Sequence, residues 1–144
     1  MSQMLEIFTD GACSGNPGEA AVGVVIKQDG KVLKEISKTI GPATNNIAEY
    51  TALIYALQEA LILRADSLKI FTDSELMYKQ VTGQYKVKHE NIKSLFDQVQ
   101  HLWKGFKHIE LIHVLREKNK EADMLATTAL KNLKKQAKMV APST

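Results

Sequence analysis

Four acidic residues could supply oxygen ligands to one site, namely Asp10, Glu49, Asp73 and Asp123. Asp10 and Asp73 each follow the tripeptide context of an apolar stretch, in EIFTD and KIFTD, and no basic residue follows either one directly. Carboxylates that lie close together repel unless a cation lies between them. Oxygen-only ligand sets select hard cations such as Mg²⁺, and two ions about 3.5–4 Å apart can promote hydrolysis of a phosphodiester. The residue types therefore predict magnesium-dependent hydrolytic chemistry.

Other chemistries fit the sequence less well. A single acid at a helix start is usually a cap or a partner of the helix dipole, so the prediction depends on the whole set of four. Zinc is disfavoured because the chain has one cysteine and its four histidines follow no ligand spacing. The segment 15–18 is not followed by Lys-Ser or Lys-Thr, which argues against a nucleotide-binding phosphate loop.

The pattern of apolar residues predicts the elements that must position these acids. Residues 4–10 alternate, and residues 20–28 and 31–40 flank an Asp29-Gly30 turn, which predicts three antiparallel strands. Apolar residues at helical spacing predict a long helix over 45–64. The remaining segments predict a strand at 67–73, a helical pair over 75–104, a strand at 108–115 and a helix over 120–135. The expected order is βββαβααβα, an α/β fold with a mixed five-stranded sheet and helices on both faces.

This order brings the acids together at one edge of the sheet. Asp10 is expected to end the first strand and Asp73 the fourth. If these strands are parallel neighbours, their carboxyl ends meet where open α/β sheets bind ligands. Glu49, in the first turns of the long helix, and Asp123, at the start of the last helix, are expected to complete the site.

The whole chain of 144 residues is expected to form one domain over 1–135, with a flexible tail over 136–144. Residues 1–78 carry six basic and ten acidic residues, whereas residues 79–144 carry thirteen and six, so the second half favours contact with a polyanion. A single cysteine indicates a reducing, cytoplasmic location. No apolar run approaches the ~20 residues of a membrane span, so no membrane contact is expected.

Four motifs give the sequence a family resemblance: TDGACSGNPG, NNIAEYTAL, TDSELMYKQ and NKEADMLA. In this order they resemble the signatures of ribonuclease H type 1, and they span residues 9–126. The resemblance implies the ribonuclease H fold and an endonuclease that hydrolyses the RNA strand of RNA–DNA hybrids by a two-metal-ion mechanism. It also implies that the catalytic and metal-binding set is Asp10, Glu49, Asp73 and Asp123, with two Mg²⁺ ions expected and Mn²⁺ as a substitute.

The resemblance further implies a set of substrate-binding residues: Cys13, Asn16, Asn45, Asn46, Ser74, Arg116 and Asn119. An asparagine amide both donates and accepts, so it can pair with a 2′-hydroxyl or a base edge in the shallow minor groove. The alternative is that Asn16 belongs only to a turn and Asn45 is only an N-cap. The expected partners are an RNA–DNA hybrid and double-stranded RNA, bound by a monomer.

The sequence departs from the family pattern in three places. It lacks the histidine-bearing loop before the last helix, where Arg116 and Glu117 are the nearest polar substitutes, and it lacks a basic protrusion. Glu75 replaces a frequent glutamine. A binding module of the same fold with weak or no cleavage therefore remains an alternative. A proofreading exonuclease would want a second acid at position 12, which is Ala12, and a junction resolvase would have no 2′-hydroxyl for the asparagines to read.

Overall fold

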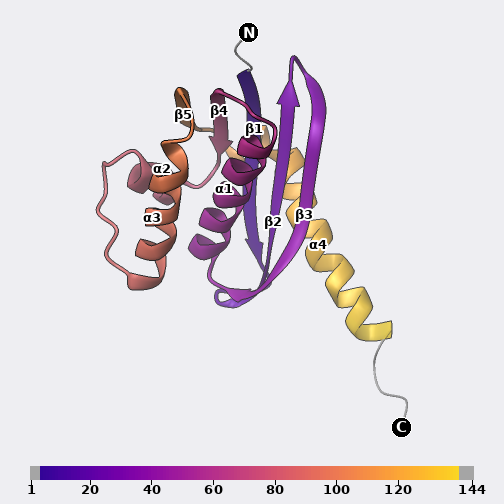
Figure 1. Cartoon of the computed structure of the whole chain (residues 1–144). Coiled ribbons are helices and arrows are strands. Elements are labelled where there is room, and N and C mark those ends of the chain that lie inside the picture. The colour runs from indigo at the N-terminus through magenta and orange to yellow at the C-terminus, as the bar shows by residue number, and fades with distance from the viewer. Residues whose placement is uncertain (1–3, 140–144) are drawn as a thin grey trace.

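The computed structural model describes residues 4–139, which form a five-stranded sheet in the order β3-β2-β1-β4-β5 (Figure 1). The pairs β1–β2 and β2–β3 are antiparallel, whereas β1–β4 and β4–β5 are parallel. The predicted order of elements and the mixed sheet are confirmed. The strands are β1 (Met4–Cys13), β2 (Gly18–Gln28), β3 (Lys31–Ala43), β4 (Ser67–Thr72) and β5 (His108–His113).

Helices cover both faces of this sheet. The helices α1 and α3 pack together over one face, and α4 packs over the other face against β1, β2 and β3 (Figure 1). No helix within residues 4–139 is both long and apolar enough to cross a membrane. The helices are α1 (Asn45–Ile62), α2 (Glu75–Val81), α3 (Glu90–Trp103), the 3₁₀ turn η1 (Arg116–Lys118) and α4 (Lys120–Met139).

The core lies mainly between the sheet and α1. Alternate residues of β1 and β4 are buried against this helix, as period-two patterning requires: Leu5, Ile7, Leu68 and Ile70. Strand β2 is instead buried on both faces, because α1 covers one side and α4 the other. A Cβ at Gly23 would overlap the carbonyl oxygen of Ala122, so the glycine allows α4 to approach the strand closely.

Two element boundaries differ from the sequence predictions. Asp10 does not end β1, because pairing with β2 continues the strand to Cys13, although parallel pairing with β4 ends at Thr9 and Thr72. Helix α4 continues to Met139, beyond the expected end of the domain at residue 135. The rest of the expected tail, residues 140–144, lies outside the described residues.

Candidate active site

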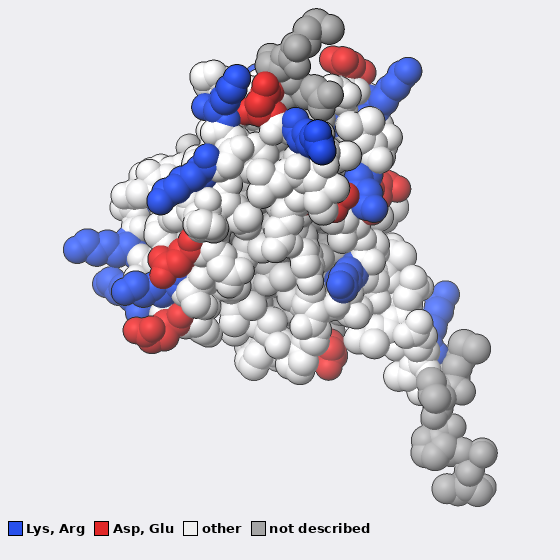
Figure 2. All heavy atoms as spheres, in the orientation of Figure 1, with Lys and Arg blue, Asp and Glu red and all other residues white. Residues whose placement is uncertain are grey.

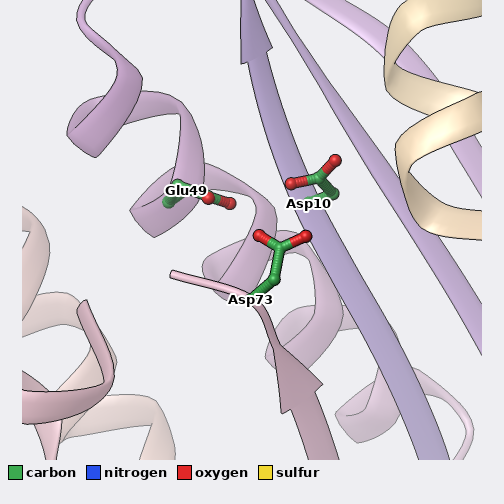
Figure 3. Close-up of side chains that lie close together, drawn as sticks. All are labelled: Asp10, Glu49 and Asp73. Atoms are coloured by element: carbon green, nitrogen blue, oxygen red, sulfur yellow. The ribbon is translucent and has the colours of Figure 1, made fainter. Parts of the chain in front are cut away.

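Three of the four predicted carboxylates converge at the carboxyl end of β4. One oxygen from each of Asp10, Glu49 and Asp73 lies within 4.8 Å of the other two. Figure 3 shows that they point toward one another from β1, α1 and the end of β4. The predicted meeting of Asp10 and Asp73 is confirmed, although Asp10 reaches the site from within a strand.

The strand register places the two aspartates together. Thr9 pairs with Thr72 in the parallel ladder, so the next residue of each strand emerges at the same edge. One residue earlier, the rings of Phe8 and Phe71 stack with centroids 4.6 Å apart. The relative position of β1 and β4 is therefore held by side-chain packing as well as by the backbone ladder.

Glu49 is positioned by a close approach of α1 to β1. The backbone N–H of Gly11 donates to Glu49 Oε1 at 2.7 Å. A Cβ at Gly11 would overlap the backbone of Ala48 and Glu49, so only glycine permits this approach. Helix α1 begins with Thr44, whose hydroxyl accepts from Ile47 N–H. The alternative that Asn45 is the N-cap is therefore wrong.

The fourth acid, Asp123, lies in the first turn of α4 and outside the cluster of three. Its carboxyl is still close enough to Asp10 to raise the pKa of Asp10 through a side-chain hydrogen bond and through its charge. The half-buried Asp123 thus extends the acidic site toward α4.

Burial and mutual repulsion together dominate the electrostatics of the cluster. Burial raises the pKa of Asp10 to about 9, with further increases from the charges of Glu49 and Asp73. Burial likewise raises the pKa of Glu49 to about 8, while the Gly11 N–H and the charge of Arg116 oppose this. Full ionisation of such a cluster near neutral pH needs a cation. A donor set made only of carboxylate oxygens fits a hard divalent ion.

A groove of about 460 Å³ adjoins the carboxylates. It contains four of the predicted substrate-binding residues together with Glu49, and its lining is Asn16, Thr44, Asn45, Asn46, Glu49, Ser74 and Leu76. Asn16 Oδ1 accepts from the N–H of Asn45, which fastens the β1–β2 loop to the start of α1. Asn46 Oδ1 is buried without a partner in the protein. The groove thus presents amide groups beside the acids.

Three other predicted substrate residues have contacts within the protein. The Cys13 thiol points toward the Ala43 carbonyl at 3.4 Å, under the groove rather than in its lining. Ser74 lines the groove, but its hydroxyl also caps α2 by accepting from Met77 N–H. Arg116 is exposed, and its charge acts on Glu49.

Asn119 differs most from its predicted role. Its side chain is 1% exposed and donates from Nδ2 to the Thr9 carbonyl at 2.8 Å and to Asp73 Oδ2 at 3.4 Å. A side chain buried in this way cannot take a substrate group as predicted. It instead connects β1, Asp73 and the start of α4, which makes it a positioning residue.

Sequence reasoning missed two supporting contacts. One is the Gly11 N–H that holds Glu49, and the glycine directly after Asp10 was the available signal. The other is a buried hydrogen bond from the Tyr50 hydroxyl to Gln80 Oε1 at 2.9 Å, which joins α1 to α2. A polar residue facing inward on α2 was the only indication of this bond.

Comparisons with known proteins agree with this site. A family model described as reverse transcriptase-like matches residues 8–129. Ribonuclease HI of Halobacterium salinarum is 42% identical over 124 residues, which are 85% of this chain and 62% of that protein. The bifunctional protein Rv2228c of Mycobacterium tuberculosis is 40% identical over 126 residues, which are 86% of this chain and 35% of that protein. This chain therefore spans less than two thirds of the length of either relative.

The structural comparison extends the similarity to the whole sheet. The structure of LC11-RNase H1 in complex with an RNA/DNA hybrid superposes with a TM-score of 0.84 at 39% identity, covering 90% of this chain and 98% of that one. The fold is therefore of the ribonuclease H-like α/β class. The chain belongs to the ribonuclease H type 1 family.

Proposed function

We propose that this protein is an endonuclease that hydrolyses the RNA strand of RNA–DNA hybrids. The observation that carries the proposal is the convergence of Asp10, Glu49 and Asp73 beside a groove lined with asparagine amides. The names of the relatives and the hybrid bound to LC11-RNase H1 support it. The intact carboxylate cluster argues against a binding module without cleavage.

The metal that fits the site best is Mg²⁺, with Mn²⁺ as a substitute. We assign the ligands to Asp10, Glu49 and Asp73, with Asp123 as the fourth acid. When bound, a pair of such ions supplies activation of water and neutralisation of charge at the scissile phosphate. The carboxylates orient this chemistry because their own positions are set by β1, α1 and β4.

The surrounding residues keep the carboxylates in place. The Gly11 N–H holds one oxygen of Glu49, and Asn119 holds Asp73 against the backbone of Thr9. Arg116 is exposed next to the cluster, so we assign it to a phosphate of the RNA strand, in place of the missing histidine loop. Its fixed positive charge would also help Glu49 to stay ionised.

Recognition of RNA is assigned to the groove. Asn16, Asn45 and Asn46 have both donors and acceptors for a 2′-hydroxyl, which distinguishes RNA from DNA. Ser74 lies on the same wall, and Cys13 supports the loop from below. A second groove shares Leu76 and includes Tyr85, Lys86 and Lys88, which suits the phosphates of the DNA strand.

The remaining assignments concern the protein as a whole. We place the catalytic domain in residues 1–135 and its action in the cytoplasm, as a monomer. Double-stranded RNA is proposed as a secondary partner, since it presents 2′-hydroxyls in the same shallow minor groove.

The test is cleavage of four labelled substrates: RNA–DNA hybrid, double-stranded RNA, double-stranded DNA and single-stranded RNA. Each is incubated with Mg²⁺, with Mn²⁺ or with a chelator. The expected result is internal cleavage of the RNA strand of the hybrid that stops in the chelator. Hybrid binding without cleavage in either metal would favour the binding module, and cleavage of DNA would favour a different nuclease.

A further inference from the structure

Helix α4 has two halves with different surroundings. Its first half packs on the sheet through small residues, including Ala122 and Ala126 against Gly23. Its second half, residues 130–138, is here called the distal arm. Figure 1 shows the end of α4 extending beyond the sheet. No acidic residue occurs after Asp123, and the arm carries four exposed lysines: Lys131, Lys134, Lys135 and Lys138.

These lysines form one stripe along the helix. Their spacings of three and four residues place them on a single face. Lys134 lines a groove of about 310 Å³ with Ser14 and Glu19 of the β1–β2 region, together with Leu130, Leu133 and Ala137. Asn132 and Gln136, on a different side of the helix, line a groove against β3 instead. The stripe therefore lies toward the β1–β2 loop.

The charges of the stripe are not balanced within the protein. Like charges at three- and four-residue spacings weaken a helix. In the described part of the chain, the ion pairs within 4.0 Å involve Lys27, Lys34 and Lys79, and none involves the arm. Figure 2 shows basic side chains on the projecting part of α4 with no acidic side chain beside them in this view. The helix dipole accounts for Lys138 in the last turn but not for Lys131.

The arm is continuous with the active-site groove through one loop. Ser14 lines the groove beside the arm, and Asn16 of the same loop lines the groove beside Glu49. A duplex that lies across the asparagines and extends over this loop meets the lysine stripe next. Its charge complements a sugar-phosphate backbone and carries no means of reading bases.

We propose that the distal arm binds backbone phosphates of the same duplex whose RNA occupies the active-site groove. This inference rests on the proposed function. The arm adds affinity outside the groove, independently of sequence, and it takes no part in the chemistry. It therefore acts on KM and on the salt dependence of binding, while kcat at saturating hybrid stays unchanged.

The test compares two variants with equal loss of charge. The arm variant is K131Q/K134Q/K135Q/K138Q, in which glutamine preserves helix propensity. The control removes four exposed lysines from the opposite end of the sheet, as K31Q/K69Q/K104Q/K107Q. Hybrid affinity is measured in chelator, without cleavage, over a range of salt concentrations. A third variant with arginine at the four arm positions keeps the charge.

We expect the arm variant to make the slope of log affinity against log salt shallower by about 2–4, since each phosphate contact contributes about 0.9. The control should change it by less than about 1, and the arginine variant should match the wild type. Replacing Glu19, which faces the arm across the groove, by glutamine should raise affinity. Circular dichroism checks that the arm variant keeps its helix, and the pair K131Q/K134Q replaces it if it does not.

Equal slopes for the arm and control variants would overturn the proposal, as would an arginine variant as weak as the glutamine one. The slope is measured on binding alone, so it is separate from the cleavage assay. A wild type that binds the hybrid but does not cleave it refutes the proposed activity, whereas one that cleaves it with an arm-independent slope refutes only the arm.

Discussion

The carboxylate cluster and the distal arm of α4 are built in opposite ways. Asp10 is 4% exposed, and the groups around it come from β1, α1, β4 and α4 with hydrogen bonds that hold them. The four lysines of the arm are exposed on one helix, without ion-pair partners among the described residues. Chemistry needs groups whose positions are fixed before substrate arrives. Electrostatic attraction to a backbone needs only charge on the correct side.

The largest effect should come from removing one charge of the cluster. Asp10→Asn is expected to lower kcat by about 10³-fold or more, equal to about 4 kcal/mol of barrier, because it weakens metal binding. Stability should stay level or rise, since repulsion with Glu49 and Asp73 is relieved. Cleavage kinetics and urea unfolding measure both. The control Asp29→Asn changes an exposed acid at the β2–β3 turn, and near-native turnover of Asp10→Asn would refute the metal assignment.

A change that carries no charge should also damage the cluster. Gly11→Ala inserts a Cβ into the backbone of α1, so we expect a loss of about 1–3 kcal/mol of stability. Displacing Glu49 by about 1 Å should also cost about 10²-fold in kcat. The matched control is Gly105→Ala, whose Cβ meets mainly the movable Leu61 side chain. If both variants unfold at the same urea concentration as wild type, the close approach of α1 does not position Glu49.

The groove should separate recognition from metal binding. Asn16→Ala together with Asn46→Ala removes two amides but leaves the carboxylates, so Mg²⁺ affinity by calorimetry should persist. We expect kcat/KM for hybrid to fall by up to about 10²-fold through misplacement of the phosphate. The pair Asn91→Ala and Asn132→Ala, at exposed sites on α3 and α4, should have no effect. Wild-type cleavage by the groove variant would mean that the two asparagines only shape the loop.

The smallest effect should be a pH dependence of stability in the metal-free protein. Burial raises the pKa of Asp10 and Glu49, so the folded state keeps protons that the unfolded state releases. Their contribution is fully present below the ordinary carboxyl pKa near 4 and is lost as pH rises toward about 9. In chelator, Tm should therefore fall by about 5 °C between pH 5 and pH 9.

Excess Mg²⁺ should reverse most of this decrease, because a bound cation stabilises the ionised carboxylates. The Asp10→Asn variant should show a flatter pH profile than the wild type, whereas Asp29→Asn should not. A metal-free Tm that rises over the same range would show that the cluster is ionised without a cation.

The elements and the meeting of the two aspartates were predictable because their signals are local. Alternating and helical periodicities identify strands and helices from neighbouring residues, and the repeated FTD marks the aspartates on β1 and β4. The cap of α1 was not predictable in the same way, since Thr44 and Asn45 are both good N-cap residues. The end of α4 was also missed, because a lysine-rich segment suits either a solvated helix or a tail.

By itself, the sequence determined the element order, the four acids and the unbalanced charge of the second half. Only the tertiary structure decided that Gly11 holds Glu49, that Asn119 is buried between Thr9 and Asp73, and that the lysines of α4 lie toward the β1–β2 loop. The physical reason is sequence separation. Gly11 and Glu49 are 38 residues apart, and Thr9 and Asn119 are 110 apart, so their contacts depend on how the helices pack on the sheet rather than on any local pattern.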